Sequence, residues 1–500
     1  MSEKLDGDLI EGPSHRGSSC ESISSIGFCE HGFCAGQVCR RQREGETRNS
    51  NAKLSKMPDL KEQAKKIFFD TLRQVDIASV VNRAVRVEER VLDVAGTRID
   101  LSQYRKVVII GIGKASIPMA AAVEALLGDA FTRGILVTDR HHTLQVKSEV
   151  LVGGHPLPNA TSVEAAGRII DLINSCGSEA LLIFLISGGG SALVEMPCTS
   201  DISLEDIRKL NQILIHSGAT IEEINIIRKH VSAVKGGKMG YLARSSTCIG
   251  LYVSDVNYED IRSIASNPLL PDSATIDDFF NVMSKYHLTE KLPPSIRALT
   301  RDGSLVGLPE DWREGGGATE LSLLLIHNRD AMQASATTAR RLGFRVEVEA
   351  GCEEGDYRYV ADQLLERLIQ LHREYPNDSV CLVSGGEVSC PVAGGGLGGR
   401  NQQFVLYCAA RLAELDPSIE AAVLCCGTDG IDGNSNAAGA VADTDLTGAA
   451  GAQGLEISPF IQGYDSHSFF KQSGGLVFTG PSGNNVRDLR ILLARRRQPT

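Results

Sequence analysis

Four segments of the sequence repeat one order of features: a run of apolar, often β-branched residues, a glycine-containing turn, and a stretch with helical character. They are residues 106–128, 181–197, 321–344 and the region around 421–433. Continuous apolar strands that alternate with helices are typical of buried parallel strands with helices on both faces of the sheet. The pattern therefore predicts an α/β fold with mostly parallel sheets, in which ligands bind beyond the carboxyl ends of the strands.

The 500 residues are enough for two or three domains with well-buried cores. A polar stretch, residues 301–320, separates two of the strand–helix blocks and has the composition of a linker or mobile insertion. We place a domain boundary there, which gives an N-terminal α/β domain over residues 58–320 and a C-terminal α/β domain over residues 321–500.

Residues 1–57 differ from the rest because they are rich in Ser, Gly, Arg and Glu and contain few large apolar residues. This composition predicts a disordered extension, and its acidic residues argue against a targeting peptide. A start of translation at Met57 is one alternative. A zinc site is another, although the spacing of its ligands matches no standard zinc finger. It would use Cys29, His31, Cys34 and Cys39.

The net charge of −11 argues against a general affinity for nucleic acid or for an anionic membrane. The longest apolar runs, such as residues 180–186, are too short to span a bilayer. Thirteen cysteines, an odd number scattered through the chain, indicate a reducing compartment. We therefore expect a cytoplasmic protein without nucleic-acid or membrane partners, for which a homodimer is one possible assembly.

Two glycine turns that directly follow apolar strands are candidate anion sites. The first, 111-GIGKAS-116, places Gly111, Gly113 and Lys114 where a helix begins, and backbone N–H groups there favour an anion. It is neither the dinucleotide fingerprint G-x-G-x-x-G nor a P-loop, and its alternative is a tight turn with a solvated lysine. A flexible turn is the alternative for the second site. That site offers backbone and hydroxyl groups from Ser187, Gly188, Gly189, Gly190 and Ser191.

Charged residues add two further candidates. A predicted helix carries the densest basic cluster, in which Arg228 and Lys235 could bind a carboxylate or phosphate, although cations near a helix C-terminus can also be structural. Asp255 lies in a loop-like segment, and Asp429 and Asp432 lie between glycines after a strand. Carboxylates in such positions suit a hydrated Mg²⁺, and ordinary turn formation is the alternative.

The stretch VAGGGLGGRNQQF, residues 392–404, holds five glycines within seven consecutive positions. Glycine loses much backbone entropy in a regular strand or helix, so this run predicts a loop that something approaches closely. We expect Gly394 to Gly399 to wrap an anionic, oxygen-rich ligand, with Arg400 as its charge partner, and we take Gly398, Gly399 and Asn401 as binding residues. Two anion cradles, a basic helix, paired carboxylates and this loop together favour phosphoryl transfer, which depends on charge neutralisation and positioning.

In its motifs and their order the chain resembles the class II glycerate kinases, whose C-terminal region is called the MOFRL domain. The resemblance runs from about residue 60 to residue 490. It rests on 111-GIGKAS-116, 154-GHPLP-158, 187-SGGGSALVEMP-197, 228-RKHVSAVKGG-237, 254-SDV-256, 384-SGGE-387, 398-GGRNQ-402, 427-GTDGIDG-433 and 479-TGPSGNNV-486.

The resemblance implies ATP- and Mg²⁺-dependent phosphorylation of D-glycerate, usually to 2-phosphoglycerate. It also implies a Rossmann-like N-terminal domain, a MOFRL-type C-terminal domain and an active site in the cleft between them. Lys114 and Arg400 match the proposed catalytic residues of the family.

Several positions depart from the family pattern. The family usually has glutamate at position 403, three residues after Arg400 at a predicted helix start, so we expect Gln403 to contact that guanidinium. The other departures are Asn159, Tyr258-Glu259-Asp260, Asn267 and Asn484 within 482-SGNN-485.

Three other functions stay open. The altered motifs could reshape the pocket for a related small hydroxy acid, or the chain could be a catalytically weakened nucleotide-binding homologue. A hydroxypyruvate reductase is disfavoured because no complete G-x-G-x-x-G with an acidic ribose partner is present.

Overall fold

The structure is a computed structural model that describes residues 58–254, 261–301, 305, 307–310, 312, 319–349, 353–391 and 395–498. Residues 57–500 form one compact unit. The extension predicted for residues 1–57 lies outside the described residues, as do Asp255 and the start of the glycine-rich loop.

The first large sheet has six strands in the order β6-β5-β4-β7-β8-β9, and all five pairings are parallel. Its strands are β4 (Lys106–Ile112), β5 (Arg133–Thr138), β6 (Glu149–Val152), β7 (Ala180–Ser187), β8 (Thr247–Val253) and β9 (Thr319–Ile326). The sequence predicted this parallel sheet correctly, because its central strands are continuous apolar runs that are buried on both faces.

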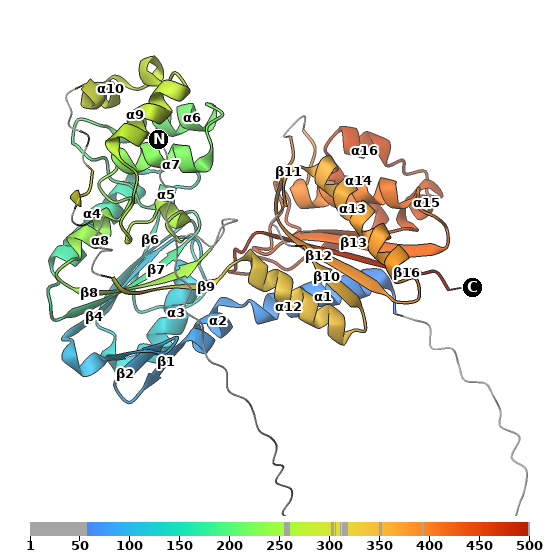
Figure 1. Ribbon diagram of the computed structural model, residues 1–500, viewed down its shortest axis with the longest axis horizontal. Coiled ribbons are helices and arrows are strands. Elements are labelled where there is room, and N and C mark those ends of the chain that lie inside the picture. Colours follow the sequence, from blue (N-terminus) through green and yellow to red (C-terminus); the bar gives the residue numbers. More distant parts are fainter. Residues whose placement is uncertain are drawn as a thin grey trace, which may run out of the picture. The chain divides into compact units, whose positions relative to one another are not determined.

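Helices cover both faces of this sheet (Figure 1). Val107 and Ile109 of β4 pack in one core with α3 (Ser116–Leu127), whereas Val108 and Ile110 pack in a second core with α4 (Ala160–Asn174). The alternation follows from the two-residue period of a strand. Other helices near this sheet are α2 (Ile77–Ala84), α5 (Gly190–Leu193) and α8 (Lys238–Leu242).

Two smaller groups of elements complete this half of the chain. A three-stranded antiparallel sheet contains β1 (Val85–Glu88), β2 (Val91–Val94) and β3 (Thr97–Asp100). A helical group with its own apolar core contains α6 (Leu204–Ile215), α7 (Ile221–His230), α9 (Ile276–Lys285) and α10 (Pro294–Arg301).

The second large sheet is mixed, so the prediction of a mostly parallel sheet is wrong here. Its order is β10-β12-β16-β13-β14-β15, with β11 also paired to β12. Four of the pairings are antiparallel and two are parallel. The strands are β10 (Arg345–Val348), β11 (Glu353–Asp356), β12 (Val380–Ser389), β13 (Ile419–Gly427), β14 (Gly439–Asp443), β15 (Leu476–Val477) and β16 (Asp488–Arg496).

The C-terminal strand explains this difference. β16 inserts between β12 and β13 and runs antiparallel to both. In addition, the turn after β13 leads into β14 without an intervening helix. Parallel neighbours need a long crossover, which this connection does not supply.

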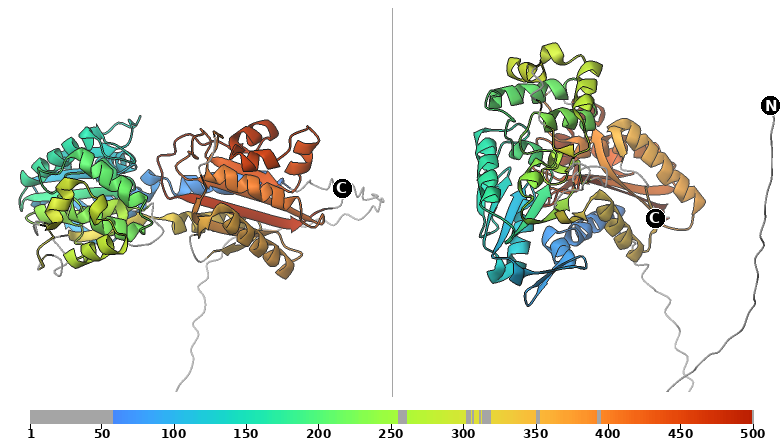
Figure 2. Two further views of the ribbon diagram at one scale, coloured as in Figure 1. Left: turned by 90° about the horizontal axis from the view of Figure 1, so that it is seen from above. Right: turned by 60° about the vertical axis from the view of Figure 1, so that its left-hand side comes forward.

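Helices also cover both faces of the second sheet, as the left view of Figure 2 shows. α1 (Leu60–Gln74) and α12 (Asn328–Arg341) pack on one face, and α13 (Tyr357–Glu374) and α14 (Arg400–Leu412) on the other. The remaining short helices are α15 (Leu446–Gly451), α16 (Ser458–Gln462) and α17 (Ser466–Ser473).

The positions of β9 and α1 can be compared with the domain boundary that was predicted between residues 320 and 321. β9 contains this point and belongs entirely to the first sheet. α1, from the start of the N-terminal segment, packs on β13 and β16 of the second sheet. The chain therefore passes from the second sheet to the first and back again.

Candidate active site

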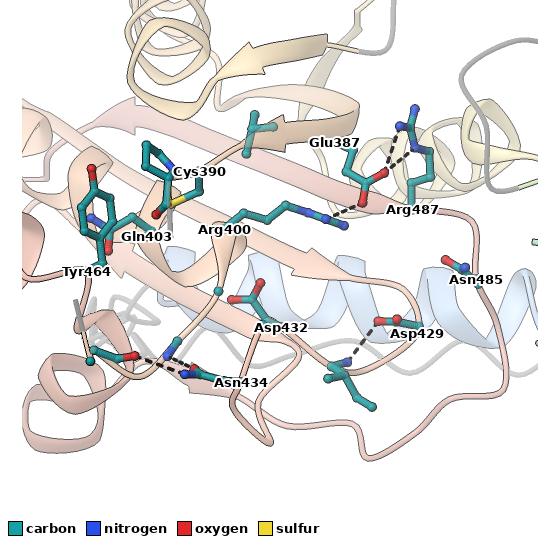
Figure 3. A pocket seen from close by; sticks show the side chains of 18 of the residues that line it. Glu387, Cys390, Arg400, Gln403, Asp429, Asp432, Asn434, Tyr464, Asn485 and Arg487 are labelled. Atoms are coloured by element: carbon teal, nitrogen blue, oxygen red, sulfur yellow. Dashed lines mark hydrogen bonds and ion pairs between the residues drawn. The ribbon is translucent and has the colours of Figure 1, made fainter. Parts of the chain in front are cut away.

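Six of the residues predicted to take part in catalysis, ligand binding or metal binding line one cavity of about 720 Å³, and Gln403 lines it as well. Lys114 comes from the turn after β4, and the others come from loops at the second sheet and from the first residue of α14. Figure 3 shows Arg400, Asp429 and Asp432 in this cavity. The six are Lys114, Gly398, Gly399, Arg400, Asp429 and Asp432.

The Lys114 turn is fixed by the neighbouring serine–glycine turn. Gly113 has a φ of 129°, and a side chain there would collide with Ser187. The backbone N–H of Lys114 donates to the carbonyl of Gly188 at 3.0 Å, and the N–H of Ala115 donates to Ser187 Oγ at 3.0 Å. Through these hydrogen bonds, Ser187 and Gly188 hold the backbone of Lys114 and Ala115 in place.

Close packing also accounts for other small residues of these turns. A side chain at Gly111 would collide with Leu136, and one at Gly190 with Ala265. Gly189 has a φ of 83°, and Ser191 Oγ lies 2.7 Å from Ser266 Oγ. Ser187 to Ser191 thus lie beside Lys114 but do not line the cavity.

Two carboxylates hold Arg400, the first residue of α14. Its Nε donates to Asp488 Oδ2 at 2.5 Å and its Nη2 donates to Asp488 Oδ1 at 3.2 Å, while Nη1 pairs with Glu387. Glu387 also accepts from Nη2 of Arg487 at 3.0 Å. Burial alone would lower the pKa of Arg400, but the charges of Asp488 and Glu387 outweigh it and raise the pKa. The guanidinium is therefore fixed and fully charged.

Asp432 caps the same helix. Its carboxylate accepts from the backbone N–H of Asn401 at 3.0 Å, from the N–H of Gln402 at 2.8 Å and from Gln402 Nε2 at 2.9 Å. Anions are favoured at a helix N-terminus, where backbone donors are otherwise unpaired. Burial raises its pKa to about 6. Asn401 donates its side-chain amide to Asp488 at 3.0 Å, so it supports the Arg400 anchor.

The glycine-rich loop packs against two other loops of the protein. A side chain at Gly396 would collide with the backbone of Tyr464, one at Gly398 with Ser466, and one at Gly399 with Asp432. A ligand is therefore not needed to explain these three glycines. The loop nevertheless forms part of the cavity wall.

Arg228 and Lys235 do not line this cavity. Arg228 Nε donates to Asn211 at 2.7 Å. Lys235 is 2% exposed and pairs with Glu195, which also accepts from Ser232 Oγ at 2.7 Å. The contact with Glu195 gives Lys235 a structural role, because a buried charge must be paired. Arg228 is half-buried, and its partner Asn211 is a neutral amide.

The expected contact between Gln403 and Arg400 is wrong. Gln403 Nε2 donates to the carbonyl of Ile461 at 2.9 Å and to the hydroxyl of Tyr357 at 3.3 Å. The helix directs the two side chains to different neighbours, and the sequence spacing alone could not show this.

A second cavity, of about 320 Å³, shares Lys114, Asp429 and Asn485 with the first. It is also lined by Arg140, which pairs with Asp139 at 2.8 Å. The sequence patterns do not indicate this cavity, because nothing in them places the loop after β5 beside Lys114. They do not indicate the roles of Glu387, Arg487 and Asp488 either. Of these three residues, only Glu387 belongs to a motif noted in the sequence, 384-SGGE-387.

The structure is that of an α/β protein with two adjoining cavities, which share Lys114 and Asp429 and are lined by the ion-paired Arg400 and Arg140. Residues 63–301 match a family described as a domain of unknown function (DUF4147), and residues 380–488 match the MOFRL family. A glycerate 2-kinase from Pyrococcus horikoshii is 32% identical over 87% of this chain and 97% of its own length.

A solved structure of a glycerate kinase from Thermotoga maritima superposes with a TM-score of 0.74 and 30% identity, covering 87% of this chain and 99% of that one. A relative from Agrobacterium vitis, 34% identical over 77% of this chain and 98% of its own length, is named provisionally as a hydroxypyruvate reductase. The chain belongs to the class II glycerate kinase family. No helix in the described part of the chain is long and apolar enough to cross a membrane.

Proposed function

We propose that this chain transfers the γ-phosphoryl group of ATP to D-glycerate, with 2-phosphoglycerate as the expected product. The observation that carries the proposal is the junction of the two cavities at Lys114 and Asp429. A kinase must bring two ligands together at the transferring group, and the larger cavity has the size for a nucleotide, whereas the smaller one suits a short hydroxy acid. Membership of the family supports the same reaction.

Each cavity contains charge suited to its ligand. Arg400 in the larger cavity can pair with a polyphosphate, and Arg140 in the smaller one can pair with the carboxylate of glycerate. Lys114, at the junction, has no ion pair within the described residues, so its ammonium is available to the transferring group. Stabilising charge that develops on that group is the main task in phosphoryl transfer.

Two carboxylates fix the position of the Arg400 guanidinium. Asp488 and Glu387 hold the guanidinium from two sides. A cation fixed before the reaction stabilises developing charge without first having to reorganise. We therefore assign Lys114 and Arg400 to catalysis and Asp488 and Glu387 to positioning.

Three aspartates were predicted to bind Mg²⁺. Asp255 lies outside the described residues, and of the other two the surroundings of Asp429 fit a metal ion, whereas those of Asp432 do not. Asp429 Oδ1 accepts from the N–H of Ile431 at 3.1 Å, and the side chain lines both cavities. Both oxygens of Asp432 are occupied by helix N–H groups. No group of three or more metal-binding side chains occurs among the described residues. Mg²⁺ often uses one or two carboxylates together with water and phosphate oxygens, and Asp429 would supply one such carboxylate. When bound, it would neutralise phosphate charge.

One assay tests the reaction: purified protein with ATP, Mg²⁺ and D-glycerate, with the product identified by phosphorus NMR. Formation of 2-phosphoglycerate and ADP is expected. NADH oxidation with hydroxypyruvate would instead support the reductase, and a faster reaction with another hydroxy acid would identify a different acceptor. Nucleotide binding without turnover would indicate a weakened homologue.

The eight cysteines among the described residues are all free. A cytoplasmic location and a homodimer both stay predictions. Gel filtration and localisation of a tagged protein would test them.

A further inference from the structure

The ends of β4 and β5 bring two charged residues to the same edge of the first sheet. These strands pair in parallel with Ile112 opposite Val137, and the N–H of Gly113 donates to the carbonyl of Val137 at 3.0 Å. Lys114 and Asp139 each follow this matched pair by two residues. Both line the smaller cavity, to which the proposed function assigns the hydroxy acid. The register of the sheet therefore places a carboxylate at the same cavity as the proposed catalytic lysine.

The Asp139 carboxylate is held by one oxygen and has capacity at the other. Its Oδ2 accepts from Nε of Arg140 at 3.2 Å and from Nη2 of Arg140 at 2.8 Å. Among the described residues, the only hydrogen bond that Oδ1 accepts from another residue comes from the Thr138 hydroxyl, at a long 3.5 Å. A carboxylate oxygen can accept two hydrogen bonds. The side chain is 11% exposed and lines the cavity, so Oδ1 can also accept from a ligand there.

We propose that Asp139 is the general base of the reaction and that its Oδ1 takes the proton of the acceptor hydroxyl. This inference rests on the proposed function. As the hydroxyl oxygen attacks the γ-phosphorus, its O–H bond breaks and the proton passes to Asp139. A new O–P bond forms, and the bond from the γ-phosphorus to the bridging oxygen breaks to leave ADP. The proton is then released to water. An aspartate that accepts the hydroxyl proton is a recurring part of kinase sites.

The pairing with Arg140 also selects the hydroxyl that reacts. Nη1 of Arg140 has no hydrogen-bond partner in the described part of the chain, so it can bind the carboxylate of the acceptor. In a 2-hydroxy acid the carboxylate and the reacting hydroxyl are on adjoining carbons. A guanidinium and a carboxylate that are themselves paired fit these two groups together. We therefore expect the 2-hydroxyl to be the one that reaches Asp139.

The other titratable side chains that line this cavity suit the role less well. Nδ1 of His142 accepts from the backbone N–H of Leu144 at 3.3 Å, so Nε2 of that ring already carries the hydrogen. His141 is exposed and forms no hydrogen bond or ion pair with the described residues, so nothing fixes its ring. Asp429 is the proposed metal ligand. Asp139 is the carboxylate that is both held in place and free to accept.

The surroundings of Asp139 keep it ionised at neutral pH. Burial alone would raise its pKa, but the hydrogen bonds and charge of Arg140 and the charge of Lys114 outweigh it and lower the pKa. His155 is also near, and burial and the charge of Lys114 lower the pKa of its imidazole. A carboxylate with a lowered pKa is a weak base. We therefore expect it to take the proton late, when bonding to phosphorus has made the hydroxyl more acidic.

Asp139→Asn keeps the shape of the side chain but cannot take a proton. We expect kcat with D-glycerate to fall by about 10²-fold or more, the usual contribution of a general base. In this variant log kcat should rise with pH, because hydroxide must then remove the proton, whereas the unmodified protein should show a flat profile around neutral pH. In Asp139→Ala, added formate should restore part of kcat, because it supplies a small carboxylate, and added chloride should not.

A matched control separates this role from a structural one. Asp378 also accepts from Nε of an arginine, that of Arg345 at 2.8 Å, but it is 44% exposed and lines neither cavity. Asp378→Asn should keep kcat and its pH profile. If Asp139 only held Arg140 in place, Asp139→Asn would raise KM for glycerate and leave the pH profile of kcat parallel to that of the unmodified protein. That result would overturn the proposal.

The unmodified protein, assayed in parallel, distinguishes this inference from the proposed function. If it forms 2-phosphoglycerate and Asp139→Asn keeps its kcat, only the role of Asp139 is wrong. If it forms no phosphorylated product, the proposed function and this inference both fail. Formation of 2-phosphoglycerate together with a pH-dependent loss of kcat in Asp139→Asn and rescue of Asp139→Ala by formate supports both.

Discussion

Asp488 and Arg400 form a two-point ion pair at the wall of the larger cavity, with N–O distances of 2.5 and 3.2 Å. The Asp488 side chain is 2% exposed, whereas that of Arg400 is 35% exposed. Asp488 thus anchors Nε and Nη2 of the guanidinium, Glu387 pairs with Nη1, and the partly exposed side chain still lines the cavity. This places Asp488 behind the proposed catalytic cation.

Replacing Asp488 by asparagine should therefore weaken the positioning of Arg400 while keeping the shape of the side chain. Hydrogen bonds to charged partners contribute about 1.5–3 kcal/mol and neutral ones about 0.5–1.5 kcal/mol, so we expect a loss of about 1 kcal/mol, or five- to tenfold in kcat. Asp445→Asn is the control, because Asp445 also pairs with an arginine at two points but is 66% exposed. An unchanged kcat in Asp488→Asn would contradict the positioning role.

Lys114→Ala and Arg400→Ala should both lower kcat by about 10²–10³, the usual loss when one charge-stabilising group is removed. Their effects on folding should differ. Lys114 has no ion pair within the described residues, so its removal should leave the melting temperature unchanged. Removal of Arg400 leaves Asp488 buried without its partner, which should destabilise the protein by about 3 kcal/mol. Steady-state kinetics and calorimetry would check both; equal melting temperatures for the two variants would be inconsistent with the ion pair.

The sequence predicted the first sheet well because each strand and its helix lie next to each other in the chain. β4 and β7 are continuous apolar runs followed by glycine turns, which give a local signal. The second sheet depends on β16, which joins strands that are distant in sequence. Local patterns contain no information about such an insertion.

The residues of the candidate active site show the same restriction of sequence patterns to local information. Lys114, Arg400 and Asp429 follow strands or glycine loops, and the structure places all three on one cavity. Lys235 looked equally suitable in the sequence, but Glu195, forty residues away, pairs with it in the interior. A basic cluster can be recognised from the sequence, but not whether a distant carboxylate already neutralises it.

Packing of the glycine-rich loop predicts a contrast between two neighbouring substitutions. A side chain at Gly399 would collide with Asp432 and Gly433, whereas one at Gly395 would meet nothing within 4 Å. Overpacking typically costs about 1–3 kcal/mol, so Gly399→Ala should lower the free energy of unfolding by that amount. Gly395→Ala should have no measurable effect. Urea denaturation of both variants tests this, and equal stability would show that the loop moves freely.

The helical group should show a pH-dependent contribution from Glu223. Hydrogen bonds from Lys285, from the Tyr286 hydroxyl and from the Thr220 backbone lower its pKa to about 2, from a usual 4.5. A lowered carboxyl pKa stabilises the fold above the usual value, and this gain is lost as the pH falls toward the lowered one. Glu223→Gln should thus lower the melting temperature at neutral pH, and the difference should shrink between about pH 4.5 and pH 2. A pH-independent difference would contradict it. Added salt should reduce the effect, because the group is near the surface.

The last prediction concerns the start of the compact unit. Removing residues 1–56 should leave the melting temperature and kcat unchanged, because that segment has too few apolar residues to join a core. The cut should leave Pro58, whose carbonyl accepts from Arg495 Nη1 at 3.1 Å. Extending the deletion through residue 75 also removes α1, whose Leu60, Ile67 and Phe68 are at most 1% exposed against the second sheet.

Full burial of such a side chain contributes about 1.5–3 kcal/mol, and three of them account for a large part of a total stability of about 5–15 kcal/mol. The longer deletion should therefore give insoluble or unfolded protein, whereas the shorter one should behave as the full chain does. Phe68→Ala, expected to cost about 3–5 kcal/mol, separates loss of packing from loss of chain length. A fall of more than a few degrees in the melting temperature after the shorter deletion would show that residues 1–56 contribute to the fold. Normal folding after the longer deletion would show that the second sheet is stable without α1. Other residues would then have to cover the apolar face of the sheet on which α1 packs.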